Sequence, residues 1–289
     1  MRQLFRPVVL LFLLVSCKGN DKKEDVEIIS NGVKIAYSKC GEGDSTLLFV
    51  HGWCISKEYW EPQLAYFCPR YTVVAIDLPG FGRSGTNRSD WSFDAYAEDV
   101  KNIIDQLKLK NVILIGHSMS GDILLKVSNL YPALVKGIVG IDNLHEPGSP
   151  LTAEQVKDNE GFFAMLSGGF DSTVSKYMTK NLFHSSTGTA IVNRVMNNVF
   201  TADSAIAIKV LQALVEASQN EKPLMQGLSH RLYLVNSDIK PVKTDSLAKY
   251  CVKGFHVELV PATGHYPMVE KPVLFNTALQ KVIDSIGRK

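Results

Sequence analysis

A serine held between small residues is the first place at which this sequence could do chemistry. Ser118 lies in the segment Gly116 to Gly121, after an apolar run at 112–115 and before a pattern of helical spacing. A sharp turn from strand to helix requires small residues two positions on either side of the serine, because larger ones make the two elements collide. Gly116 meets this requirement, and Ser120 stands where a second glycine is usual. The pattern predicts that Ser118 is a nucleophile.

A serine nucleophile needs a base, and a histidine is the side chain that most often serves. A neutral imidazole takes the serine proton and later returns it to the leaving group. His265 follows the last predicted strand and precedes the last predicted helix, and it is the only one of the seven histidines with this order and context. We therefore expect His265 to be the general base and acid.

A second glycine turn is expected at the end of an earlier strand. His51-Gly52-Trp53 follows the apolar run at 46–50, and with this motif the chain resembles the α/β-hydrolase superfamily over nearly all of residues 28–289. The resemblance implies an oxyanion hole formed by the backbone N–H groups of Trp53 and Met119. Met119 begins a predicted helix, where free N–H groups and the helix dipole favour an anion. His51 is interpreted as a structural, hydrogen-bonded histidine.

The acid that orients the histidine has two candidates. Asp238 follows the predicted strand at 232–235, which fits the usual position of the acid in the superfamily and the chain order Ser, Asp, His. Asp142 ends an earlier strand, and some members carry their acid there. Asp238 is the preferred acid and Asp142 the alternative.

The elements that must position these residues alternate along the chain. Asn31-Gly32 between two apolar runs predicts a hairpin. Strand and helix patterns then alternate, which implies right-handed crossovers and a mainly parallel sheet. Between about 144 and 228 only helical patterns occur, so we predict a helical cap inserted after the sixth strand. The predicted fold class is α/β, a mostly parallel twisted sheet flanked by helices, with a core at 28–143 and 229–289 and a cap at 144–228.

The first 16 residues have the pattern of a secretory signal peptide. Arg2 and Arg6 precede an unbroken apolar run at 8–15, which is too short to span a bilayer. Leu14-Val15-Ser16-Cys17 ends this run and resembles the lipobox of bacterial lipoproteins, in which cleavage precedes the cysteine and lipid is attached to it.

These features predict a signal peptide at 1–16, lipid attachment at Cys17 and a polar, charged, flexible tether at 17–27. The expected location is the bacterial cell envelope, facing either the periplasm or the surface, with the lipid anchor holding the protein on a membrane.

Charge and cysteine content limit the other classes of function. The sequence has 31 basic and 29 acidic residues, and without Arg2 and Arg6 the basic residues also number 29. This balance gives no indication of a nucleic-acid partner. No spacing typical of a metal site or a nucleotide loop occurs, so neither a metal nor a cofactor is expected. An exported protein can form disulfides, and three pairings remain open for Cys40, Cys54, Cys68 and Cys251.

Together these patterns predict a serine hydrolase that cleaves a small or medium carboxylic ester, lactone or thioester through a Ser118 acyl-enzyme. A serine nucleophile separates the chain from dehalogenases and epoxide hydrolases of similar fold, which use aspartate. Apolar cap residues could line a pocket for an apolar acyl part of a small-molecule substrate: Phe162, Phe163, Met165, Leu166, Tyr177, Met178, Phe183, Met196 and Phe200. Carbon–carbon bond hydrolysis, perhydrolysis and non-catalytic ligand binding remain alternatives, and no oligomeric state is predicted.

Overall fold

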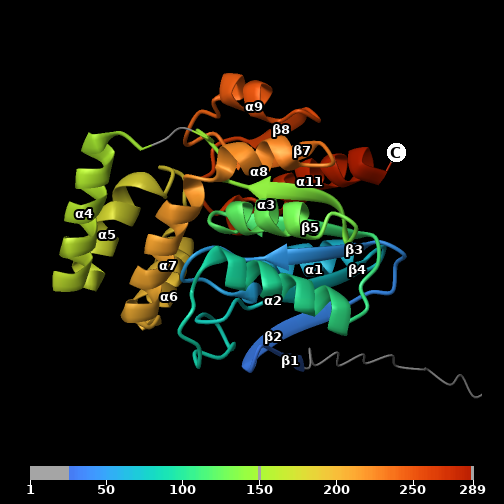
Figure 1. Ribbon diagram of the computed structural model, residues 1–289, viewed down its shortest axis with the longest axis horizontal. Helices are drawn as coiled ribbons and strands as arrows, with labels where there is room; N and C mark the ends of the chain where they lie inside the picture. Colours follow the sequence, from blue (N-terminus) through green and yellow to red (C-terminus); the bar gives the residue numbers. More distant parts are fainter. Residues whose placement is uncertain (1–25, 149–150, 288–289) are drawn as a thin grey trace, which may run out of the picture.

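The computed structural model describes residues 26–148 and 151–287, so the predicted signal peptide, Cys17 and most of the predicted tether lie outside it. Eight strands form one sheet in the order β1-β2-β4-β3-β5-β6-β7-β8 (Figure 1). Strands β3 to β8 pair in parallel, whereas β1 with β2 and β2 with β4 are antiparallel. The strands are β1 (Val26–Ser30), β2 (Val33–Cys40), β3 (Thr46–Val50), β4 (Thr72–Ile76), β5 (Val112–His117), β6 (Val135–Ile141), β7 (Leu232–Ser237) and β8 (Phe255–Val260).

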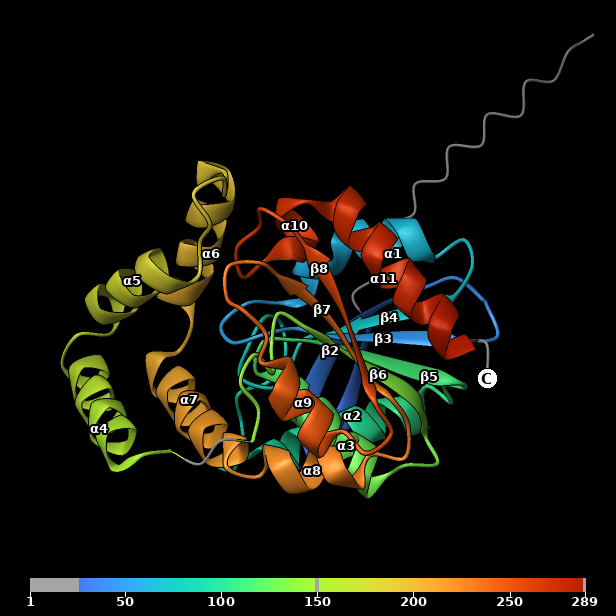
Figure 2. The ribbon, with the colours of Figure 1, turned by 90° about the horizontal axis from the view of Figure 1, so that it is seen from above.

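The central strands are apolar throughout because helices cover both faces of the sheet. Every residue of β3 and β5 is buried, as expected for parallel strands between two helical layers. Helices α2 and α3 pack together on one face, and α1 and α11 on the other (Figure 2). These helices are α1 (Glu61–Phe67), α2 (Phe93–Gln106), α3 (Ser120–Leu130) and α11 (Pro272–Gly287). The predicted mostly parallel α/β architecture is confirmed.

The first hairpin forms where the sequence predicts it. Ser30 pairs with Val33, and the two turn residues Asn31 and Gly32 have φ values of 48° and 81°. Both values lie in the left-handed region, which asparagine and glycine tolerate better than other residues.

A helical insertion follows β6, as predicted. Helices α4 (Ala153–Gly168), α5 (Phe170–Asn181), α6 (Thr189–Thr201) and α7 (Ser204–Ser218) stand together beside the sheet (Figures 1 and 2). Thr152 and Gln155 form a capping box that starts α4, and Asp203 accepts a hydrogen bond from Ile206 N at the start of α7. The last helix of the predicted cap segment, α8 (Glu221–Gly227), packs against α3 of the core more extensively than α7 does.

Two short helices complete the core, α9 (Thr244–Tyr250) between β7 and β8 and α10 (Pro267–Glu270) before α11. In the described part of the chain no single helix is both long and apolar enough to cross a membrane. Helices α6 and α7 reach that length and composition only as a pair, and the chain bends by 102° between them.

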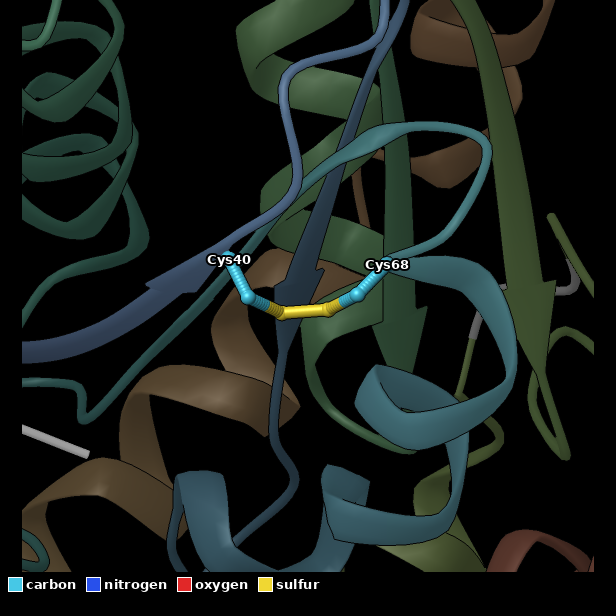
Figure 3. The surroundings of a disulfide bond; sticks show 2 residues. All are labelled: Cys40 and Cys68. Carbon is cyan, nitrogen blue, oxygen red and sulfur yellow. A yellow bond between two sulfur atoms is a disulfide. The ribbon is translucent and has the colours of Figure 1, made fainter. Parts of the chain in front are cut away.

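One disulfide selects among the three pairings that the sequence leaves open. Cys40, the last residue of β2, is bonded to Cys68, which follows α1 (Figure 3). Cys54 and Cys251 are free thiols and are buried. The bond therefore joins an antiparallel edge region of the sheet to a helix on one of its faces.

We predict that replacing both bonded cysteines (Cys40→Ala with Cys68→Ala) lowers the free energy of unfolding by about 3 kcal/mol, because the bond closes a loop of 28 residues in the unfolded chain. Urea denaturation checks this value. Dithiothreitol should bring the wild-type protein to the stability of the double variant and leave the variant unchanged. Equal stability of oxidised wild type and double variant would contradict the prediction.

Candidate active site

Ser118 occupies a strained turn between β5 and α3. Its φ of 54° lies in the left-handed region, which is costly for a residue other than glycine. The turn is held because Ser118 N donates a hydrogen bond to the carbonyl of Ile141 on β6, at 2.9 Å, and Gly121 N donates to the carbonyl of Ser118 at the same distance. The half-buried serine hydroxyl is thereby presented at the carboxyl end of the sheet.

Close contacts with neighbouring atoms explain why a small residue is needed near Ser118. A Cβ atom added to Gly116 would lie 2.8 Å from Cδ1 of Leu124 and 2.9 Å from the carbonyl oxygen of Ser120, so a side chain at position 116 would push the strand from the helix. Ser120 replaces the usual second glycine without such a clash. Its hydroxyl donates a 2.5 Å hydrogen bond to the carbonyl of His51, and this bond ties the serine turn to the turn at 51–53.

Ser118, His265 and Asp142 form one hydrogen-bonded series, although they are far apart along the chain. Nε2 of His265 lies 2.8 Å from Oγ of Ser118, and Nδ1 lies 2.5 Å from Oδ2 of Asp142. Burial raises the pKa of Asp142, but the interactions with His145 and His265 outweigh it and hold that pKa well below its usual value. Asp142 is therefore an ionised carboxylate that can stabilise a positive charge on His265.

The preference for Asp238 as the partner of His265 is corrected, because the alternative, Asp142, occupies that position. Strand β7 continues to Ser237, two residues further than the sequence pattern predicted. Both the backbone N–H and the hydroxyl of Ser237 donate to Oδ1 of Asp142, at 2.8 Å and 2.6 Å. Asp238 follows on an exposed part of the loop, where Oδ1 accepts a hydrogen bond from Ala262 N. It supports the segment that leads to His265 and does not contact the imidazole through any hydrogen bond in the described residues.

The turn at 51–53 approaches the serine closely. A Cβ atom added to Gly52 would lie 3.0 Å from Cβ of Ser118 and 2.5 Å from Nδ1 of His117, so only glycine fits here. Neither Trp53 nor Met119 uses its backbone N–H in a hydrogen bond within the part of the chain that the structure describes. Two amides next to the serine thus have no acceptor of their own, and the oxyanion role assigned to them stays a prediction.

Two other histidines near the site are buried and form hydrogen bonds with its backbone. Nδ1 of His51 contacts the carbonyl of Gly52 and its Nε2 accepts from Leu78 N, while burial lowers its pKa. Nε2 of His117 lies 2.7 Å from the carbonyl of His265, so this nitrogen carries the proton and donates. Burial lowers the pKa of His117 to about 3, which keeps the ring neutral. The structural interpretation of His51 fits these contacts, and His117 supports the backbone of His265.

Some supporting residues have no signal in the sequence pattern. Nδ2 of Asn143 donates to the carbonyls of Gly116 and Ser118, at 2.9 Å and 3.2 Å, and thus braces the serine turn from the end of β6. Nε2 of His145 lies 3.6 Å from Oδ1 of Asp142, on the opposite carboxylate oxygen from His265. Both residues follow β6, and the position of Asp142 is the only clue that could have drawn attention to them.

Glu270 joins the cap to the loop that carries His265. Its Oε2 accepts hydrogen bonds from Gly264 N at 2.8 Å and from the hydroxyl of Thr187 at 2.7 Å, and its Oε1 accepts from Tyr266 N at 3.1 Å. In addition, the backbone N–H of His265 donates to the carbonyl of Leu182 at 2.8 Å. The connection between α5 and α6 and the histidine loop are therefore fixed to each other.

A cavity of about 480 Å³ lies over Ser118 and His265. Of the apolar cap residues singled out in the sequence, four line it, whereas Met165 and Phe200 are exposed. The residues that line the cavity are Trp53, His117, Ser118, Asp158, Asn159, Phe162, Phe163, Val174, Tyr177, Met178, Leu182, Leu211, Leu214, Val215, Lys240, His265 and Tyr266. The site thus brings a serine hydroxyl, an imidazole and a buried carboxylate together next to a mainly apolar chamber.

Comparison with known proteins agrees with this architecture. Residues 45–175 match the family model of the alpha/beta hydrolase fold. The chain is 28% identical over 258 residues to a pimeloyl-[acyl-carrier protein] methyl ester esterase of Legionella pneumophila, covering 87% of this chain and 100% of that protein.

Solved structures give the same result. An esterase from Thermogutta terrifontis superposes with a TM-score of 0.78 at 20% identity, covering 90% of this chain and 98% of that one. A haloalkane dehalogenase variant from Bradyrhizobium elkanii has a TM-score of 0.70 at 18% identity, covering 91% and 96%. The chain has the α/β-hydrolase fold, as the resemblance implied, and proteins of different chemistry share it.

We predict that Asp142→Asn slows the reaction of Ser118 with a fluorophosphonate by about ten-thousand-fold, because an amide cannot stabilise the imidazolium of His265. The matched variant Asp238→Asn should have a much smaller effect, since that side chain accepts a hydrogen bond from Ala262 N and, among the described residues, none from the imidazole of His265. Mass spectrometry of the labelled protein over time measures both rates. The assignment of Asp142 fails if the larger loss is found at Asp238.

Proposed function

We propose that this protein, which has the α/β-hydrolase fold, is a serine hydrolase that cleaves small or medium carboxylic esters, including lactones and thioesters. The observation that carries the proposal is the continuous hydrogen-bonded series from Ser118 through His265 to Asp142, of which Ser118 and His265 line the cavity. The Legionella and Thermogutta proteins add support, because both are named esterases, and the Thermogutta esterase shares this fold.

The reaction begins with proton transfer from the hydroxyl of Ser118 to Nε2 of His265 as Oγ attacks the carbonyl carbon of the ester. The carbonyl oxygen gains negative charge and is stabilised by the backbone N–H groups of Trp53 and Met119. One such donor contributes about 3 kcal/mol to the transition state. Asp142 stabilises the imidazolium formed at His265, and the 2.5 Å hydrogen bond to Nδ1 fixes the ring with Nε2 facing the serine.

Collapse of the tetrahedral intermediate breaks the bond to the leaving group, which takes the proton from His265. The acyl group then remains on Ser118 as an ester. Water enters, His265 removes one of its protons, and attack on the acyl carbon releases the acid and restores the serine hydroxyl. The mainly apolar wall supplied by residues such as Phe162 and Met178 suits an apolar acyl part.

The protein is further proposed to be an exported lipoprotein of the bacterial cell envelope, with lipid on Cys17. The lipobox-like sequence supports this location, and the disulfide between Cys40 and Cys68 is of the kind that persists in oxidising compartments.

Mass spectrometry of the mature protein from a bacterial envelope fraction should find Cys17 as an acylated first residue. A Cys17→Ser variant should lack the lipid and the cleavage that precedes position 17. A mature protein that begins, unmodified, at another residue would end this part of the proposal.

We predict that Ser118→Ala abolishes the stoichiometric fluorophosphonate adduct and lowers kcat for ester hydrolysis by about a million-fold, because the triad acts as a unit. Ser120→Gly is the matched control: it restores the usual glycine of the turn and keeps the nucleophile, so the adduct should still form. Assays would use p-nitrophenyl esters of increasing chain length.

Near-normal turnover by Ser118→Ala would overturn the nucleophile assignment. A folded wild-type protein that forms no adduct would favour a ligand-binding protein on the same fold. Product analysis with diketones, and with peroxide in the assay, would identify carbon–carbon bond hydrolysis or perhydrolysis by the same triad.

A further inference from the structure

One amino group stands out in the lining of the cavity over Ser118. Lys240 is the only lysine or arginine among the described residues that line it, and most of the remaining wall is apolar. Asp158 on α4 is the only carboxylate in that lining. Nothing in the esterase mechanism uses either side chain, because the proton transfers run between Ser118, His265 and Asp142.

The ammonium of Lys240 makes no hydrogen bond or ion pair with any residue of 26–148 or 151–287. Two acidic side chains outside the cavity lining have partners of their own. Asp238 accepts a hydrogen bond from Ala262 N, and Glu146 pairs with Lys243. Its positive charge is therefore available to an anion that enters the largely apolar chamber, and because the Lys240 side chain is itself exposed, solvent also screens that charge.

Lys240 belongs to the core and Asp158 to the cap. Lys240 lies three residues after the end of β7, and β7 is placed between β6, which leads to Asp142, and β8, which leads to His265. Its backbone is thus anchored to the same sheet edge as the acid and base. Asp158 lies on α4, the cap helix whose only buried residue is Leu166.

We propose that Lys240 is a specificity-determining residue that binds an anionic group of the substrate, a carboxylate or a phosphate, at a distance from the bond that is cleaved. This inference rests on the proposed esterase function and deepens it. The substrate class is then an ester with an apolar segment that ends in a negative charge. The apolar segment fills the chamber, the ester carbon meets Ser118, and the terminal anion pairs with the ammonium.

Asp158 provides a stringent test of the proposal, because its carboxylate in the same lining repels an anion that enters the cavity. A preference for anionic esters consequently requires a direct contact with Lys240. Replacing Lys240 removes a positive charge from the cavity, and replacing Asp158 removes a negative charge. Comparison of the two variants therefore distinguishes a direct contact from a general electrostatic effect.

The experiment compares kcat/KM for p-nitrophenyl octanoate, for the p-nitrophenyl monoester of the eight-carbon dicarboxylic acid, and for an octanoate analogue that ends in a phosphonate. The measured quantity is the kcat/KM of each anionic ester divided by the kcat/KM of the neutral ester. The kcat/KM of the neutral ester itself shows whether each variant retains a working nucleophile. The carboxylate and phosphonate arms identify which anion is preferred.

We expect Lys240→Gln to lower this ratio by about tenfold or more, as for loss of a hydrogen bond between charged groups. Lys240→Arg should recover most of the ratio because it keeps the charge. Asp158→Asn should raise the ratio by a smaller factor than Lys240→Gln lowers it.

An unchanged ratio in Lys240→Gln overturns the proposal, and so do equal and opposite shifts in Lys240→Gln and Asp158→Asn, which indicate the general field of the cavity. Failure of the esterase function is a separate result. It would appear as wild-type protein that hydrolyses none of the three esters and forms no fluorophosphonate adduct at Ser118.

Discussion

The hydrogen bond between His265 and Asp142 is the interaction on which the rest of the site depends. It joins the loop after β8 to the end of β6 across the intervening strand β7, and it orients the imidazole toward Ser118. Asp142 is 2% exposed, so its charge is compensated by donors and not by solvent. Ser237 supplies two of these donors from β7. The ends of β6, β7 and β8 must therefore be correctly aligned before His265 can contact both Asp142 and Ser118.

The sequence predicts the sheet, the serine turn and the histidine because each depends on local chemistry. Small residues around Ser118 allow its strained turn, and the order of strands and helices places His265 after β8. It does not predict the acid, because Asp142 and Asp238 both follow strands of the same sheet. The choice depends on where β7 ends, and the apolar pattern that marks a strand does not extend to Asn236 and Ser237, which are polar yet buried.

Contacts between the cap and the core are the other feature beyond the reach of sequence patterns. Glu270 accepts hydrogen bonds from Thr187 in the cap and from Gly264 beside the histidine. Neither partner is marked by periodicity or by a known motif, and the pairing bridges 83 residues in one case and six in the other. The contact makes the position of the α5–α6 connection and that of His265 interdependent, so the geometry of the base includes part of the cap.

The location of the acid on β6 has a consequence for how this protein can diversify. Where the acid follows β7, the loop after that strand must keep a fixed length and a fixed carboxylate. In the proposed mechanism that loop, which includes Lys240, takes no part in the chemical step, because Asp142 contacts His265 from the neighbouring strand. Substitution within this loop, at positions other than Asp238, can therefore change the charge of the cavity and leave the hydrogen bonds among Ser118, His265 and Asp142 in place.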